Sequence, residues 1–358
     1  MRVFRIRAIH FFTFTAGMGF IVLLFLLPEA AKNGAWQGLL ACAEVVVPSL
    51  FPFMTVSLFL TKTGLPKWVS RPLDLLCRGL FLDRHGVDIL LSFTAGFPVG
   101  GLLIAEEYKA GLLNERRAAA RMTYCVNSGP AFIITAVGLG MLGSAEIGLL
   151  LFLAVTAAAL ANGIVFSRLL LSREETPPPP PRQSEGFSSA FVGSVSAAAT
   201  QMLGISGFVV FFSTLVSLLG CLPLSKRLSP ILAQVLEVTV GALASRREAL
   251  PMIAAGLGFG GLSVICQVLC LVRTVPFSRG IFLLSRLTHG ALSALFARLL
   301  LPLFPLAREV LLSTGRPNAA AGLSLPLGLA MAFMCVTLIV CAKEEGSLLL
   351  ESRKKNKL

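Results

Sequence analysis

The sequence predicts an all-α polytopic membrane protein, with about eight transmembrane helices plus two re-entrant hairpins in two inverted repeats. Three observations support this fold class. Of the 358 residues, 55% are hydrophobic and only 14% are charged. Apolar runs of membrane-spanning length follow one another, and backbone in lipid has to satisfy its own hydrogen bonds, as a helix does. Glycine and proline interrupt several of these runs.

Charged residues and cysteines exclude several function classes. The net charge is +13, but Lys and Arg stand in short clusters between apolar runs, where they orient membrane helices. We therefore expect a lipid bilayer as partner, and no nucleic acid; a homo-oligomer stays open. The eight cysteines show no CxxC or Cys/His spacing, so we expect no metal and no cofactor. The sequence has no Ser/His/Asp set, phosphate-binding loop or catalytic pair of carboxylates, so we expect no enzyme activity.

The N-terminal apolar run, residues 11–27, follows the basic stretch MRVFRIR. No small-x-small cleavage site precedes Trp36, so we interpret residues 1–37 as a transmembrane anchor rather than a signal peptide. Both interpretations start the chain in the cytoplasm. Residues 29–37 are short and nearly neutral, and we expect them to form an outside loop.

Residues 38–172 form the first predicted repeat. Its first apolar run contains Pro48 and Pro52, which predict a kinked or interrupted helix because proline removes a helical hydrogen bond. Residues 62–88 carry several Lys and Arg beside an apolar face, and we expect a helix lying on the cytoplasmic membrane surface.

The stretch FTAGFPVGGLLIAEEYKAGLLNERR, residues 93–117, is too broken for a lipid-facing helix and too apolar for a solvated loop. Arginines flank both of its ends. If both flanks are cytoplasmic, the chain enters and returns as a re-entrant hairpin that turns near GFPVGG. The alternative is a single kinked span, which reverses the topology of everything after it. We expect Glu106 and Glu107 at the wet end of the hairpin.

The first repeat ends with a run at 122–143 that contains CVNSGPAF and with a span at 145–171. Residues 173–187 include five consecutive prolines and predict an extended, solvated linker between the halves.

The second predicted repeat, residues 188–303, has the same order of features. A membrane run at 203–222 precedes VLEVTVG, then the glycine-rich GLGFGGLSVICQ, then a span at 281–303. Residues 304–358 predict a C-terminal transmembrane helix at 320–341 and a basic cytoplasmic tail.

The two repeats are expected to be inverted because an odd number of crossings separates them, which leaves both termini in the cytoplasm. Inverted repeats with discontinuous helices recur in secondary transporters. This arrangement places Lys226, Arg227, Arg246 and Arg247 outside, against the positive-inside preference.

Four broken stretches are predicted to meet at the centre: GFPVGG, CVNSGPAF, VLEVTVG and GLGFGGLSVICQ. Each leaves backbone N–H and C=O groups that must face protein, water or a polar solute. The candidate solute-binding residues are Gly96, Phe97, Pro98, Gly100, Asn127, Ser128, Gly129, Pro130, Glu237, Thr239, Gly241, Gly258, Gly260, Gly261, Ser263 and Gln267.

Glu237 is the strongest single candidate, because a carboxylate at membrane depth is costly unless it is paired, protonated or solvated. The alternative is an interfacial segment from which Glu237 reaches water. For Asn127 to Pro130, the alternative is close helix packing through small residues. We expect His289 to be a packed or interfacial residue rather than a ligand.

Several motifs, in this order, resemble the sporulation integral membrane protein YlbJ family: PSLFPF, GFPVG followed by Tyr-Lys-x-Gly, NSGPAFII with VGxGMxG, and GFGGLSVxxQVL. The resemblance covers residues 45–298. That family carries the nucleoside-recognition or Gate domain, which also occurs in concentrative nucleoside transporters and in ferrous-iron transport proteins.

This resemblance implies a multi-pass protein of the cell membrane of an endospore-forming bacterium, needed for spore formation. In the nucleoside transporters, hairpin tips and broken helices hold the nucleoside, and GFPVGG and GLGFGG occupy comparable places here. The Gln-Thr-Glu and Asn-Glu-Phe signatures of those carriers are absent. We expect transport or binding of a small polar solute, nucleoside-like or other, at the midplane. The alternative is a non-transporting assembly or scaffold protein for the spore envelope.

Overall fold

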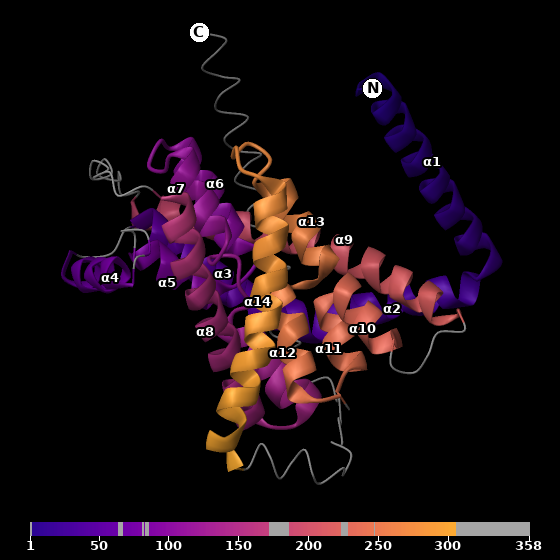
Figure 1. Cartoon of the computed structure of the whole chain (residues 1–358). Helices are drawn as coiled ribbons and strands as arrows, with labels where there is room; N and C mark the ends of the chain where they lie inside the picture. Colours follow the sequence, from indigo (N-terminus) through magenta and orange to yellow (C-terminus); the bar gives the residue numbers. More distant parts are fainter. Residues whose placement is uncertain are drawn as a thin grey trace.

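The computed structural model describes residues 2–63, 67–80, 82, 86–171, 186–222, 228–246 and 248–305. Across these ranges the chain is helical and contains no strand (Figure 1). The proline-rich linker, the expected span at 320–341 with its basic tail, and the side chains of Lys226, Arg227 and Arg247 lie outside the described residues.

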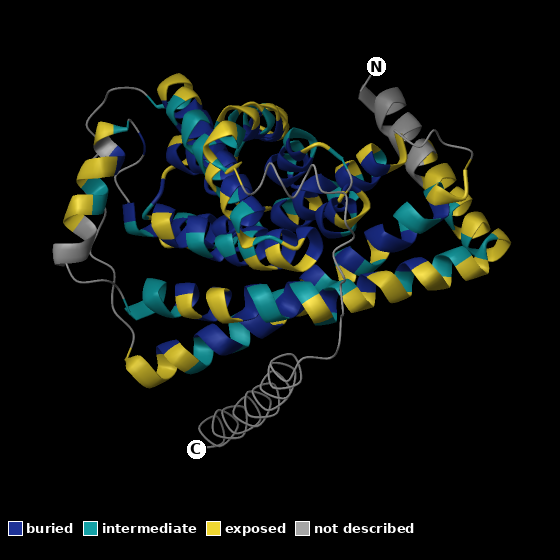
Figure 2. Cartoon of the chain, turned by 90° about the horizontal axis from the view of Figure 1, so that it is seen from below, coloured by how far each residue is buried: buried dark blue, intermediate teal, exposed yellow. Residues whose placement is uncertain are grey.

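The protein is an all-α, multi-pass membrane protein. Within the described ranges, five helical stretches are long and apolar enough to cross a membrane: Pro28–Thr63, Ala145–Leu170, Phe187–Gly220, Leu250–Leu271 and Arg279–Leu303. Three shorter apolar helices add to them. Figure 2 shows buried residues lining the interior while the outward faces of the long helices are exposed. The number of crossings and the inverted relation of the halves stay predictions.

The N-terminal helix α1 (Arg2–Leu26) leans away from the body, and α2 (Pro28–Ala41) follows it almost directly (Figure 1). The outside loop expected at 29–37 is therefore wrong. Those residues are helical because Gly34 and Gly38 let α2 approach α9 (Phe187–Gly220) closely. A Cβ atom on Gly34 would lie 2.6 Å from the Ser217 Cβ.

Of the kinked or interrupted helix expected at Pro48 and Pro52, the interruption is absent and the kink stays a prediction. A π-helical turn, η1 (Cys42–Val46), leads directly into α3 (Val47–Thr63), which contains both prolines. The widened turn bonds the Val47 N–H to the Cys42 carbonyl, and such turns absorb an irregularity in the hydrogen-bond ladder without ending the helix.

The expected surface helix is shorter than predicted. Helix α4 spans Lys67–Gly79, with Leu75 and Leu76 exposed. Lys62 belongs to the end of α3, and Asp88 is buried in the next helix, so residues 62–88 are not one element.

Residues 93–117 form a helical hairpin rather than one kinked span. Helices α5 (Gly86–Ala95) and α6 (Val99–Lys109) meet at a turn, where Gly96 has a φ of 75°. A Cβ atom on Gly100 would lie 3.4 Å from the Ser92 Cβ. Residues this far apart in one straight helix are separated by about 12 Å, so the chain folds back.

The rest of the first half consists of a broken segment and a long helix. Helix α7 (Glu115–Met122) ends before an irregular stretch, and the π-helix η2 (Ala131–Met141) continues beyond it. Helix α8 (Ala145–Leu170) then packs against η2 and α7.

The second half repeats this order after α9, which begins well before the predicted run at 203–222 because its first turns pack against α3. The elements that follow are α10 (Leu228–Leu236), α11 (Val238–Ala244), α12 (Leu250–Phe259), α13 (Gly261–Leu271), α14 (Arg279–Leu300) and the short η3 (Leu301–Leu303). Helix α14 lies against both α8 and α12.

Glu107 is not at a wet end, which corrects the prediction for this residue. It is 3% exposed and forms an ion pair with Arg121 of α7, which is also buried. Glu106, one residue earlier, is exposed as predicted. Glu107 faces the interior of the protein, where Arg121 is its buried partner.

Glu107→Gln is expected to lower the stability of the protein by about 3 kcal/mol, because it removes the carboxylate that forms a buried ion pair with Arg121. Thermal unfolding in detergent measures this as a lower Tm. Glu106→Gln, at the exposed neighbouring residue, is the matched control and should lower the Tm much less. Equal Tm values for the two variants would show that the ion pair does not stabilise the hairpin.

Candidate functional site

The second half contains a helical hairpin that matches the first. Helices α10 and α11 are joined at Glu237, whose backbone is extended with a φ of −143°. A Cβ atom on Gly241 would lie 2.4 Å from the Gln234 Cα, so α11 folds back directly on α10. Gly241, predicted as a binding residue, therefore serves the close packing of the two arms.

Each hairpin tip lies against the broken segment of its own half. A Cβ atom on Gly96 would lie 2.5 Å from the Gly129 backbone nitrogen. On the other side, a Cβ atom on Gly261 would lie 3.1 Å from the Val238 nitrogen, at the second tip. Gly96 and Gly261 have φ values of 75° and 77°, which favour glycine at both contacts.

The two halves also contact each other at these breaks. The Ser128 hydroxyl donates a hydrogen bond to the Leu257 carbonyl of α12, at 3.1 Å. The Phe97 ring lies 3.6 Å from the place where a Cβ atom on Gly260 would stand. The four broken stretches thus form one continuous centre, as the sequence predicts.

A small cavity of about 20 Å³ lies at this centre, large enough for a single water molecule. Of the predicted binding residues, Phe97, Gly129, Glu237, Thr239 and Gln267 line it. Apolar side chains complete the wall: Val46, Leu50, Phe132, Ile205, Val209, Val238 and Val264.

Glu237 is 1% exposed, so the alternative in which it reaches water does not fit the structure. One carboxylate oxygen, Oε2, accepts a hydrogen bond of 2.6 Å from the Val240 N–H and so caps α11. Among the described residues, no Lys, Arg or His forms an ion pair with this carboxylate. A carboxylate in this position is costly for the protein to bury.

Asn127 and Gln267 add amide groups near the same centre. Asn127 is 1% exposed, and neither its Oδ1 nor its Nδ2 has a hydrogen-bond partner. The Gln267 Nε2 donates to the Ser263 hydroxyl at 3.2 Å. Buried polar atoms are nearly always hydrogen-bonded, so the unpaired carboxamide of Asn127 indicates a missing hydrogen-bond partner.

Other predicted site residues shape the backbone around the cavity. Pro98 precedes α6 and Pro130 precedes η2, each at the start of its helix. A Cβ atom on Gly100 would lie 2.0 Å from the Cys125 carbonyl oxygen, and one on Gly258 would lie 2.3 Å from the Ser293 hydroxyl. These two glycines allow close packing and do not line the cavity.

Sequence reasoning missed Arg286, which reaches the first break from α14. Its guanidinium is 2% exposed and donates hydrogen bonds to the carbonyls of Thr123 and Val126. An arginine inside a predicted span was the available signal, on a helix that also carries Arg279 and Arg298 near its ends. His289, on the same helix, is fully buried and contacts the Val155 carbonyl, which confirms that it is packed.

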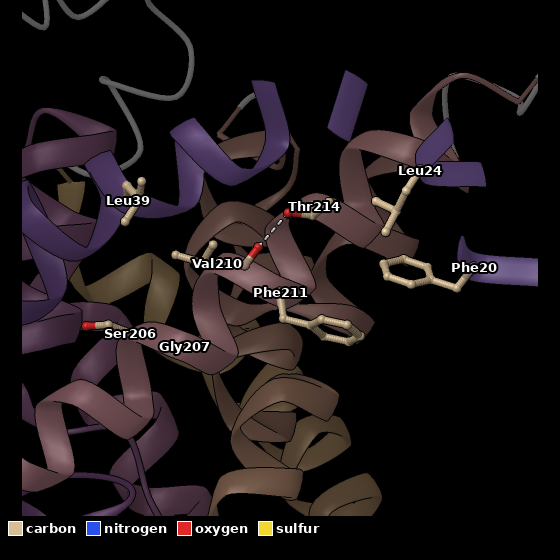
Figure 3. A pocket seen from close by; sticks show the side chains of 8 residues that line it. All are labelled: Phe20, Leu24, Leu39, Ser206, Gly207, Val210, Phe211 and Thr214. Carbon is tan, nitrogen blue, oxygen red and sulfur yellow. Dashed lines mark hydrogen bonds between the residues drawn. The ribbon is translucent and has the colours of Figure 1, made fainter. Parts of the chain in front are cut away.

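A larger hollow of about 470 Å³ lies on the outer surface between α1, α2 and α9 (Figure 3). Its lining is mostly apolar, with Phe20, Leu24 and Phe211 at one end. The Thr214 hydroxyl, which also lines it, donates to the Val210 carbonyl within α9. Because no charged side chain lines this groove, the central cavity is the better candidate for a polar solute.

Potential metal ligands do not cluster in the part of the chain that the structure describes. There, no group of three or more His, Cys, Asp or Glu side chains could hold a metal ion.

One curated relative matches along most of the chain. The protein is 25% identical over 320 residues to the sporulation integral membrane protein YlbJ of Bacillus subtilis (strain 168), covering 76% of this chain and 78% of the relative. No family model matches the chain. No solved structure matches it either. The nucleoside-recognition Gate domain stays a prediction.

Proposed function

We propose that the chain, which is 25% identical over 320 residues to the sporulation integral membrane protein YlbJ of Bacillus subtilis, binds a small polar solute at the central cavity and carries it across the membrane during sporulation. Two hairpin tips, two broken helices and a buried carboxylate meet at that cavity. Secondary transporters commonly bind their substrates in such an arrangement.

The free carboxamide of Asn127, which does not line the small cavity itself but lies two residues before Gly129 of its wall, is the observation that carries the proposal. Glu237 has a structural role as the cap of α11, which uses one of its oxygens. Asn127 has no comparable structural partner, although it is buried next to the hairpin tip that carries Gly96. An unpaired buried amide costs about 1–3 kcal/mol, and a bound solute with a donor and an acceptor would offset this cost.

On this proposal, the small volume of the cavity corresponds to a closed state of the solute site. A site of about 20 Å³ accommodates one water-sized group, whereas substrate pockets usually measure about 300 Å³ or more. Any larger solute requires the hairpin tips to move away from the broken helices. The contacts at Gly96 and Gly261 are where that movement would begin, because there the tips touch the breaks directly.

Solute uptake into proteoliposomes tests this function. We expect purified protein to take up or bind at least one member of a panel of nucleosides, amino acids and inorganic ions. Uptake should fall to the level of protein-free vesicles in Asn127→Ala, while Glu106→Gln retains it. Absence of both flux and binding across the panel would favour the scaffold role in spore-envelope assembly.

A further inference from the structure

Arg286 is a buried cation that the proposed solute site does not use. It lies on α14, and its Nη2 donates to the Thr123 carbonyl at 2.6 Å while its Nη1 donates to the Val126 carbonyl. The Phe282 ring lies 5.5 Å from its guanidinium carbon. Among the described residues, Arg286 forms no ion pair with a carboxylate. Its charge is therefore directed at two backbone oxygens of the first broken segment.

The sequence explains why these carbonyls need an outside donor. In a regular helix the Val126 carbonyl would accept from the residue four positions later, which is Pro130 and has no N–H. The Thr123 carbonyl would accept from Asn127, where the helix has already ended. Both oxygens are thus left without a helical partner in a region where lipid supplies none.

Hydrogen bonds between α14 and α8 fix the part of α14 that carries Arg286. The Asn162 side chain of α8 donates to the Ser285 carbonyl at 2.7 Å and accepts from the Thr288 hydroxyl at 2.9 Å. His289 contacts the Val155 carbonyl at 3.0 Å. These contacts lie immediately before and after Arg286, so they fix the rotation of α14 against α8.

We propose that Arg286 is a positioning residue that holds the break at residues 123–130 in its non-helical path. The planar guanidinium suits this task, because it carries several N–H groups in a rigid fork and can join two carbonyls at once. Holding Thr123 and Val126 fixes the direction in which Asn127 and Gly129 leave the helix. Through them Arg286 acts on the proposed solute site, but the positioning itself does not depend on any solute.

Cys125 offers a native reporter for this role. It lies between the two carbonyls that Arg286 binds, and it is 1% exposed. In a full-length protein with the other seven cysteines replaced, N-ethylmaleimide labelling of Cys125 measures how often the break opens. We expect Arg286→Met to raise the labelling rate about tenfold, which corresponds to about 1.4 kcal/mol. Arg298→Met, an exposed arginine on the same helix, should leave the rate unchanged.

Two further variants separate positioning from general stabilisation. Asn162→Ala loosens α14 without touching the break, so it should lower the Tm and leave Cys125 protected at temperatures where the protein is folded. Arg286→Lys keeps a cation but cannot span both carbonyls, so its labelling rate should lie between the native and Arg286→Met rates.

Equal labelling in Asn162→Ala and Arg286→Met would reduce Arg286 to a stabilising residue. If Cys125 in Arg286→Lys is labelled as slowly as in the native protein, the two-carbonyl geometry is unnecessary and the proposal is overturned. This test does not need Arg286→Met, so it also decides the case in which that variant fails to accumulate. A failure to find solute uptake would remove the proposed function, yet it would leave these labelling results unaffected.

Discussion

Replacing Glu237 with glutamine is expected to abolish the proposed contribution of the protein to sporulation while the protein still inserts and accumulates. Glutamine keeps the shape of the side chain, and its carbonyl oxygen can still accept the Val240 N–H that caps α11. The substitution removes the negative charge from the wall of the cavity. A carboxylate retained at membrane depth is costly, so its loss should affect solute binding more than folding.

Sporulation complementation measures this effect in a strain that lacks the native gene, with immunoblots to confirm equal membrane abundance. Glu106→Gln is the control, because Glu106 is an exposed residue on α6 that does not line the cavity. We expect near-normal spore counts from that strain. Normal spore counts from the Glu237→Gln strain would show that the charge is not needed, and the proposed site would then rest on Asn127 and the backbone breaks.

The breaks could be predicted from sequence because their causes are local. Gly96, Gly260 and Gly261 adopt positive φ values that other residues disfavour, and Pro130 removes the N–H that would continue a helix. Each of these effects depends on the identity of one residue. Residue identity was therefore enough to locate the breaks, whereas their placement at one centre followed from the expected repeat architecture.

Features that depend on partners distant in sequence could not be predicted. The helix at 28–41 forms where its glycines meet α9, and nothing within its own neutral sequence distinguishes it from a loop. Glu106 and Glu107 are chemically identical neighbours, and only the rotation of α6 decides which one meets Arg121. Sequence patterns describe which residues can be buried, but they do not identify the side chain across the interface.

Gly100→Ala is expected to separate the first hairpin from the first break and to eliminate function. The added Cβ atom would lie 2.0 Å from the Cys125 carbonyl oxygen and 2.9 Å from its carbon. Backbone atoms cannot move aside as a flexible side chain can, so α6 or the stretch at 123–130 must shift. Overpacking of this kind costs about 1–3 kcal/mol, and here the strain falls on the contact between the hairpin and the break.

Gly204→Ala is the matched control for this prediction. Gly204 also lies inside a helix, α9, but a Cβ atom there would meet nothing within 4 Å. Both substitutions gain the same helix propensity, about 1 kcal/mol, so any difference between them arises from the contact with Cys125. We expect Gly204→Ala to complement sporulation fully and to have an unchanged or higher Tm in detergent. If Gly100→Ala also complemented fully, close contact between hairpin and break would not be required, and the proposal that solute binding depends on their junction would fail.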